Sequence, residues 1–281
     1  MNRQRLRRGI SNLMVAAMGV AVVLAVLPLL LILGTLVVKG AGSINLDFFL
    51  KMPVPAGETG GGVANAVVGT LLIVGAACLI GIPIGMAAGI YCAEYQGSRL
   101  ALITRFVADV LNGTPSIVVG VVAWTLIVAR QKHFSGLAGS VALAMLMIPM
   151  VMRTTEELIK LVPNSLREAA LALGYPRWRT SLAIVVRTTL PGIVTGVLLA
   201  TARIAGETAP LLFTALGSQF MGTNLNQPMA ALPLTVFTYA TGPYEEWHRL
   251  AWATALVLIV VVLLLSVVAR LATRQRFDRR G

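Results

Sequence analysis

The stretch TGGGVANAVVGTLLIVGAACLIGIPIGMAAGIYCA, Thr59 to Ala93, contains no Asp, Glu, Lys or Arg in 35 residues. About 20 predominantly apolar residues are enough to cross a bilayer core of roughly 30 Å. A second uncharged stretch, Gly9 to Val38, runs for 30 residues. Working outward, six membrane-spanning segments fit the chain, at about 12–38, 65–90, 106–129, 136–156, 190–214 and 250–270. The sequence therefore predicts an all-α, polytopic membrane protein.

The composition supports a membrane protein over a soluble one. Of 281 residues, 57% are hydrophobic and only 12% are charged, with a net charge of +12. A soluble globular protein is about one quarter charged, and a disordered chain needs low hydrophobicity. Burying six apolar helices inside a soluble protein would require amphipathic helices to cover them. The residues outside the six segments do not supply such helices. The positive charge does not form one water-exposed basic face, so we expect no nucleic-acid partner.

The distribution of Lys and Arg predicts the orientation. Basic residues concentrate in the N-terminal segment 1–11, in the loops that precede the third and fifth predicted spans, and in the C-terminal tail 271–281. Because cytoplasmic loops carry the excess of Lys and Arg, we expect both termini in the cytoplasm. The first apolar segment is too long for a signal peptide, so it is predicted to remain as a span of the transmembrane region 12–270, in contact with membrane lipid.

Few side chains suggest chemistry. Cys78 and Cys92 lie in or near one predicted helix and are interpreted as small packing residues, whereas His133 and His248 are isolated near outer loops. No metal-ligand spacing, P-loop motif or nucleophile–base arrangement is present in the sequence. We therefore expect no catalytic residue, no metal and no cofactor in this chain.

The longest predicted cytoplasmic loop, 157–189, has the pattern of a helix–turn–helix outside the bilayer. Pro163 ends one helix, Asn164 or Ser165 can cap the next, and Gly174 can end it in the left-handed conformation. A second short helix is predicted from Trp178 to Val186. The small alanines of the first helix suit docking into a groove of another protein.

Glu168-Ala169-Ala170, followed after three residues by Gly174, is similar to the "EAA" loop of ABC importer permeases. The resemblance implies the type I importer permease fold, with these four residues on a coupling helix that seats in a cleft of a cytoplasmic ATPase subunit. Many relatives have Leu-Pro about 19 residues after the Glu, whereas here Leu190-Pro191 comes a turn later. The start of the fifth span is therefore uncertain by about a turn.

Two further segments resemble phosphate-specific importer permeases: ARIAGETAPLLFT, 202–214, and DVLNGTPSIVVG, 109–120. With the outer-loop sequence QPMAALP and EWHRLAW before the last span, the chain is similar to PstA-type rather than PstC-type subunits. The resemblance implies transport of inorganic phosphate across a bacterial inner membrane. It also implies partners: a PstC-type permease, a PstB-type ATPase dimer that binds ATP and Mg²⁺, and a PstS-type phosphate-binding protein.

Arg203 and Glu207 are the only charges between Thr188 and Tyr244. Arg203 is expected roughly 20 Å along the fifth helix, with Glu207 on the same face. Charges at this depth need a partner or water. One interpretation is an Arg–Glu pair that fixes helix packing. The other is that both line the substrate path, where Arg203 holds the phosphate oxygens and Glu207 tunes release.

Gly113-Thr114-Pro115-Ser116 predicts a break within the third span. Thr114 can cap, and Pro115 can begin, a half-helix over 116–129. Its free N–H groups would attract an anion, so Thr114 and Ser116 are candidate substrate-path residues; a kink that accommodates a neighbouring helix is the alternative. Asp109 is a candidate gate or interface residue, or an ion-pair partner for Arg105 or a loop arginine.

The outer loops 39–64 and 216–249 are candidates for docking a substrate-binding protein. Trp247 and Trp252 lie where an interfacial aromatic belt is expected. Two rival functions remain open. A permease for sulfate or molybdate would share the architecture, whereas a passive anion channel would not need the coupling helix.

Overall fold

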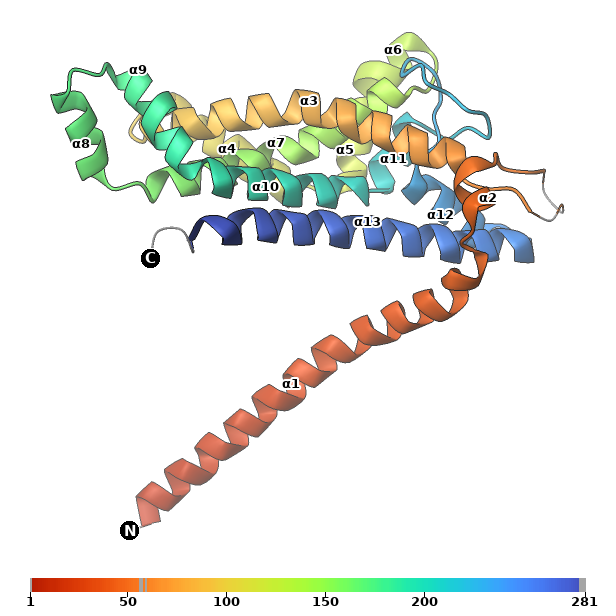
Figure 1. Cartoon of the computed structure of the whole chain (residues 1–281), viewed down its shortest axis with the longest axis horizontal. Coiled ribbons are helices and arrows are strands. Elements are labelled where there is room, and N and C mark those ends of the chain that lie inside the picture. The colour runs from red at the N-terminus through yellow and green to blue at the C-terminus, as the bar shows by residue number, and fades with distance from the viewer. Residues whose placement is uncertain (1, 56–57, 59, 278–281) are drawn as a thin grey trace.

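The computed structural model describes residues 2–55, 58 and 60–277, and within them the chain is helical apart from its loops and one isolated β-bridge, Leu216 to Met229. Figure 1 shows the arrangement of these helices. Their bounds are α1 Asn2–Gly40, η1 Ala41–Ser43, α2 Leu46–Leu50, α3 Ala64–Glu94, α4 Arg99–Gly113, α5 Ser116–Ala123, α6 Ala129–Gln131, α7 Gly136–Lys160, α8 Asn164–Ala172, α9 Arg177–Arg179, α10 Arg187–Ala205, α11 Ala209–Thr214, α12 Leu232–Thr241 and α13 Glu245–Phe277. Two π-helical segments, η2 Trp124–Val128 and η3 Thr180–Val186, continue α5 into α6 and α9 into α10.

Five of the described helices are long and apolar enough to cross a membrane, and a bent pair brings the number to six if it counts as one span. The five are Ile10–Ser43, Ala64–Glu94, Gly136–Lys160, Arg177–Ala205 and Glu245–Leu271. The all-α, multi-span prediction is therefore confirmed. The last four residues of the predicted tail, 278–281, lie outside the described residues, and 271–277 continue α13.

The third and fifth segments differ from their predicted bounds. The third, expected at 106–129, is the pair Arg99–Gly113 and Ser116–Gln131, bent by 107°. Thr114 is extended, at φ −78° and ψ 131°, because the residue before a proline avoids the helical region. The fifth, expected at 190–214, starts at Arg177 and ends at Ala205. The separate helix predicted for 178–186 is thus the first part of this long helix, because η3 keeps helical dihedrals at both ends.

Helices α3 and α7 form the centre of the bundle and pack against each other along glycines of α3 spaced four residues apart. A Cβ on Gly85 would lie 2.8 Å from Val151 Cβ, and one on Gly89 would lie 2.6 Å from the Met152 carbonyl oxygen. Small residues at this spacing let apolar helices approach closely within a membrane. Leu143 and Met147 of α7 are fully buried in the resulting core.

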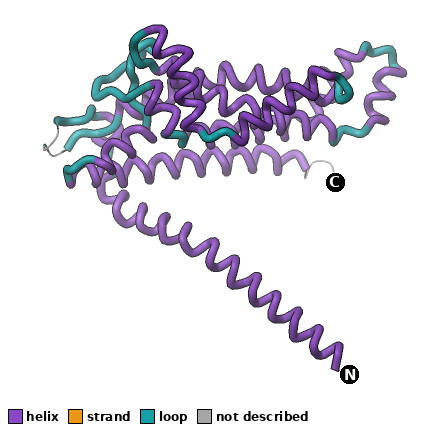
Figure 2. Tube along the Cα trace, turned by 180° about the vertical axis from the view of Figure 1, so that it is seen from behind, coloured by secondary structure: helices purple, strands orange, loops and turns teal. Residues whose placement is uncertain are grey.

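Helix α1 leaves the bundle near its C-terminal end, where it meets α13, and extends away at an angle (Figures 1 and 2). A Cβ on Gly40 would lie 2.8 Å from the Trp252 carbonyl oxygen, so glycine permits this crossing. The start of α1, the end of α13 and the helix α8 all lie toward the same end of the long axis in Figure 1. The loop 215–231 and α2 lie toward the opposite end of this axis.

Candidate functional site

Helix α8 forms as a short, separate helix beyond the end of the bundle. It begins at Asn164 because Pro163 occupies the N-cap position with an extended backbone, at φ −58° and ψ 142°. No side chain caps it, so the predicted capping by Asn164 or Ser165 is wrong. Gly174 has a φ of +82°, as predicted. Its N–H donates to Leu171 at 2.9 Å and that of Tyr175 donates to Ala170 at 3.2 Å, which is a Schellman ending.

The exposed surface of α8 contains most of the predicted coupling residues. Glu168, Ala169 and Gly174 are exposed, whereas Ala170 is 3% exposed and faces the bundle. In Figure 1, α8 projects beyond the ends of α3 and α10. The predicted helix is therefore present, with a polar and small-residue surface open to solvent.

Three side chains that sequence reasoning missed attach α8 to the bundle. Arg167 of α8 forms an ion pair with Glu94, the last residue of α3, and its Nη2 donates to the Ile159 carbonyl oxygen at 3.2 Å. The other Glu94 oxygen accepts a hydrogen bond from Ser181 Oγ at 2.8 Å. The available signal was the position of Glu94, because it ends the uncharged stretch Thr59–Ala93.

A buried carboxylate, Glu156 of α7, holds three basic side chains at the same end. Arg105 Nε lies 2.6 Å and Lys160 Nζ 2.5 Å from Oε1, and Arg153 Nη1 lies 3.5 Å from Oε2. Arg105 also donates to the carbonyl oxygens of Cys92 at 2.6 Å and Gln96 at 3.2 Å. This cluster joins α4 to the ends of α3 and α7.

Asp109 pairs with Arg153 of α7 rather than with Arg105 or a loop arginine. Arg153 donates to Asp109 Oδ1 from both Nε, at 3.1 Å, and Nη2. Arg105 is engaged by Glu156 instead. Asp109 therefore lies at the contact between α4 and α7 of this chain, and its predicted role as a gate or interface residue stays a prediction.

The predicted break at 113–116 is present, with different capping from that expected. Thr114 is the C-cap of α4 and donates its hydroxyl to the Val110 carbonyl oxygen at 2.7 Å. Pro115, not Thr114, is the N-cap of α5, and no side chain caps that helix. Ser116 begins α5 and is half-buried, without a hydrogen bond from its hydroxyl to any described residue.

Helix α5 packs against α11, which follows a second break at 206–208. A Cβ on Gly120 of α5 would lie 2.7 Å from Pro210 Cα in α11, so the backbones approach closely at this point. Helix α5 follows the break that contains Thr114, and α11 follows the break that contains Glu207. The two breaks therefore lead into two helices that contact each other.

The structure does not bring Arg203 and Glu207 together. Arg203 lies in the last turn of α10, which ends at Ala205, and Glu207 lies beyond it in the break. The prediction that Glu207 shares a helical face with Arg203 is therefore wrong, because Glu207 lies outside the helix. Neither side chain makes an ion pair or hydrogen bond with a described residue, and Arg203 is exposed whereas Ala202 and Ile204 beside it are buried. The packing interpretation of an Arg203–Glu207 pair is wrong for this chain alone.

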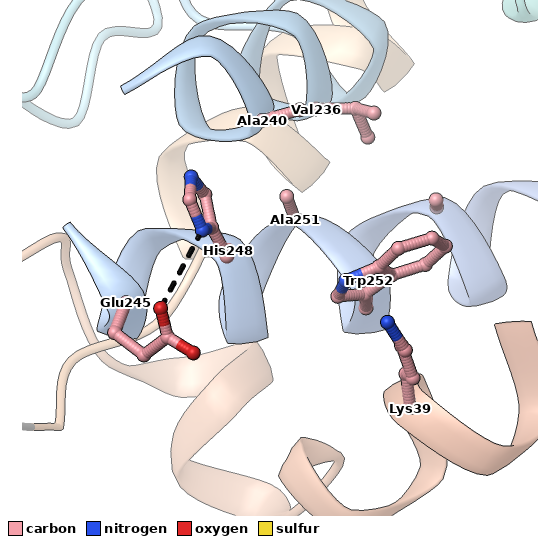
Figure 3. Close-up of a pocket in the computed structure, with 8 residues that line it drawn as sticks. Lys39, Val236, Ala240, Glu245, His248, Ala251 and Trp252 are labelled. Atoms are coloured by element: carbon pink, nitrogen blue, oxygen red, sulfur yellow. Dashed lines mark ion pairs between the residues drawn. The ribbon is translucent and has the colours of Figure 1, made fainter. Parts of the chain in front are cut away.

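Two hollows lie at the end of the molecule opposite α8. One, of about 420 Å³, lies between α1, α12 and α13, and Figure 3 shows Lys39 beside Trp252 and Glu245 beside His248. The other, of about 650 Å³, is lined by His133 and by residues of the loop from Ser218 to Pro228. Neither is lined by a predicted site residue. Within the described residues no three His, Cys, Asp or Glu side chains gather as a metal site requires.

Comparison with known proteins agrees with this architecture. Residues 81–280 match the family described as binding-protein-dependent transport system inner membrane component. The chain is 52% identical over 243 residues to the phosphate transport system permease protein PstA of Yersinia pestis, covering 86% of this chain and 82% of that protein. It is 47% identical to PstA of Haemophilus influenzae, covering 94% of each.

Among solved structures, the fold is similar to a chain of the MetNI methionine ABC transporter in an inward-facing conformation. The TM-score is 0.64 at 18% identity, covering 76% of this chain and 95% of that one. A similar match, with a TM-score of 0.56, is to an amino acid ABC transporter. At such identities the likeness concerns the fold alone.

Proposed function

This chain belongs to the binding-protein-dependent transport system inner membrane component family, and within it to the PstA permeases; from that premise we propose how its residues carry the substrate. The chain is a multi-pass membrane protein and the permease subunit of an ABC importer for phosphate. Its task is to open a path for phosphate alternately to each side of the membrane, without chemistry on the substrate.

Arg203 is the residue proposed to contact phosphate in transit. The observation that carries this role is an exposed guanidinium without an ion-pair partner in the described residues, at the end of an apolar spanning helix. A cation placed there is costly unless it meets water, protein or an anion. A guanidinium fork matches the oxygens of phosphate. Glu207, a few residues later, is proposed to compete for Arg203 and so to speed release.

The start of α5 is proposed as a second contact on the path. Ser116 and the first N–H groups of α5 have no intrahelical acceptor, and such groups favour an anion. Interrupted helices that line a cavity are a common way to build a substrate site in a transporter. Thr114 is proposed to shape this turn through its bond to Val110 rather than to hold phosphate directly.

Helix α8 is proposed as the ATPase-docking element, through the exposed residues Glu168, Ala169 and Gly174, whereas the buried Ala170 packs α8 against the bundle. Its projection beyond the bundle and its solvent-exposed small residues support this role. ATP and Mg²⁺ would be bound by a separate PstB-type ATPase dimer, and this chain would hold no cofactor. Asp109, paired with Arg153, is proposed to brace α4 as the path opens and closes.

The orientation follows from the placement of α8. If α8 meets an ATPase in the cytoplasm, the start of α1 and the end of α13, which lie toward the same end, are cytoplasmic as well. The loop 215–231 and the hollow lined by His133 would then face a PstS-type phosphate-binding protein outside the bacterial inner membrane. Lipid and a PstC-type permease would cover the exposed apolar helices.

Reconstitution tests this proposal. The chain is assembled in lipid vesicles with its permease partner and ATPase, the binding protein is added outside, and ATP-dependent uptake of labelled phosphate is compared with that of labelled sulfate. The proposal expects phosphate uptake that stops without ATP. Uptake of sulfate in place of phosphate would overturn the substrate assignment, and uptake without ATP would indicate a passive channel.

A further inference from the structure

Glu94, the last residue of α3, is the side chain at which several helices meet. One carboxylate oxygen pairs with Arg167 of α8, and the other accepts from Ser181 Oγ, near the start of the long helix that ends at Ala205. Arg167 continues the contact to the last turn of α7, through the Ile159 carbonyl oxygen. One carboxylate therefore links α8 to α3 and to η3, which continues into α10, and Arg167 adds α7.

The surroundings of this link make it stronger than a surface ion pair. The Glu94 and Arg167 side chains are each only 20% exposed. They lie beside a buried apolar cluster formed by Ala93, Ile159, Val162 and Val185. Charge-assisted hydrogen bonds are short and strong, and partial burial reduces their screening by salt.

Both oxygens of Glu94 are in use, and the two donors come from different helices. An ionised carboxylate accepts at both oxygens, whereas a glutamine offers one acceptor oxygen and an NH₂ group that only donates. With glutamine at position 94, the NH₂ group would face either Arg167 or Ser181. If it faces Arg167, the hydrogen bond to α8 is lost; if it faces Ser181, whose hydroxyl can also accept, Arg167 keeps one acceptor oxygen but loses its counterion. The link to α8 is therefore weakened in either case, although the side chains keep the same size.

The same end of α3 is also attached to α4. Arg105 of α4 donates to the carbonyl oxygens of Cys92 and Gln96, which flank Glu94, and pairs with Glu156 of α7. Helix α4 runs from there to the break at Gly113–Pro115. A displacement of the end of α3 is therefore passed to the helix that leads to the proposed substrate path.

We infer that Glu94 is a positioning residue that transmits movement of α8 to the helices lining the phosphate path. The inference rests on the proposed function, in which α8 meets the ATPase. Within α8, Ala170 is buried and Arg167 is half-buried, whereas the other residues are exposed. Losing the Glu94 link leaves α8 able to bind the ATPase but less able to pull α3 and α10 with it.

The test is Glu94→Gln in the complete importer, reconstituted in lipid vesicles with the phosphate-binding protein. The quantity measured is labelled phosphate taken up per ATP hydrolysed, normalised to assembled complex. We expect this ratio to fall about tenfold, the size of a strong pairwise coupling, while ATP hydrolysis continues. The charge exchange, Glu94→Arg with Arg167→Glu, should recover much of the ratio, because Ser181 can also accept a hydrogen bond.

Glu157→Gln is the matched control, because this exposed neighbour of Glu156 has no ion-pair or hydrogen-bond partner for its carboxylate in the described residues. Its ratio should equal that of the unaltered importer. If Glu94→Gln does not accumulate, Arg167→Gln breaks the same link from the other side, and the same fall is expected.

Two results overturn the inference while the proposed function stands: a ratio within about twofold of the unaltered importer, or a loss only in the amount of assembled complex. If the unaltered importer takes up no phosphate, the proposed function fails, and the inference fails with it.

Discussion

Arg105 of α4 and Glu156 of α7 form an ion pair, with 2.6 Å between Nε and Oε1, across the interface that holds the broken third segment against the bundle. The Glu156 side chain is only 1% exposed, and Lys160 and Arg153 also form ion pairs with it. A buried charge is tolerated when it is paired and hydrogen-bonded. The cluster therefore fixes α4 at an end of the bundle where many other α4 side chains are exposed.

Removing this carboxylate should destabilise the protein more than removing an exposed one. In Glu156→Gln, Arg105 keeps its carbonyl acceptors but loses its counterion, and Lys160 loses its buried partner. Truncating one member of a buried pair is strongly destabilising, and because the cations here are partly exposed we expect about 2 kcal/mol. Thermal unfolding of the purified protein in detergent measures the effect. An unchanged melting temperature would contradict this role for Glu156.

Gly120→Ala should disturb the contact between α5 and α11. The added Cβ would lie 2.7 Å from Pro210 Cα, and a backbone atom cannot move aside as a side-chain end can. Overpacking of this kind costs about 1–3 kcal/mol, so we expect lower thermal stability and weaker phosphate uptake. Gly75→Ala is the control, because nothing lies within 4 Å of its Cβ. Equal behaviour of the two variants would show that the close approach is unimportant.

Gly174→Ala should weaken docking of the ATPase without a steric clash. No atom lies within 4 Å of the added Cβ, but the φ of +82° is strained for any residue with a side chain. A strain of about 1 kcal/mol that frays the end of α8 corresponds to roughly fivefold weaker binding. Titration of the reconstituted permease pair with purified ATPase measures this affinity. Gly97→Ala, at an unstrained and open position, should bind normally.

Much of the fold could be predicted because uncharged length and glycine or proline signals act locally. The apolar stretch Thr59–Ala93 became α3 almost in full, and Pro163 and Gly174 set the ends of α8. Pro115 broke the third segment where expected. The bend of 107° at that break was not predictable, because a proline prevents continuation but leaves the direction of the next helix to packing.

The ion-pair networks at the α8 end could not be predicted from local pattern. Glu94 and Arg167 are 73 residues apart in the chain, and only the packing of α3, α7 and α8 brings them together. Arg203 and Glu207 were expected on one helical face from their spacing, but α10 ends at Ala205 with Gly206 as its C-cap, so the helical spacing does not continue to Glu207. Charges within apolar segments singled out Arg203 and Glu207 as candidates, but a charge in the sequence does not indicate which side chain lies beside it in the fold.

The central claim is that Arg203 meets phosphate as it crosses the membrane, and uptake by an Arg203→Gln importer tests it most directly. The complete complex is reconstituted with each variant, and labelled phosphate uptake is measured alongside ATP hydrolysis and assembly. We predict that Arg203→Gln assembles and hydrolyses ATP but takes up phosphate at least about tenfold more slowly, and that Arg203→Lys, which keeps the charge without the fork, falls between the two. Phosphate uptake by Arg203→Gln at the rate of the unaltered importer would contradict the claim.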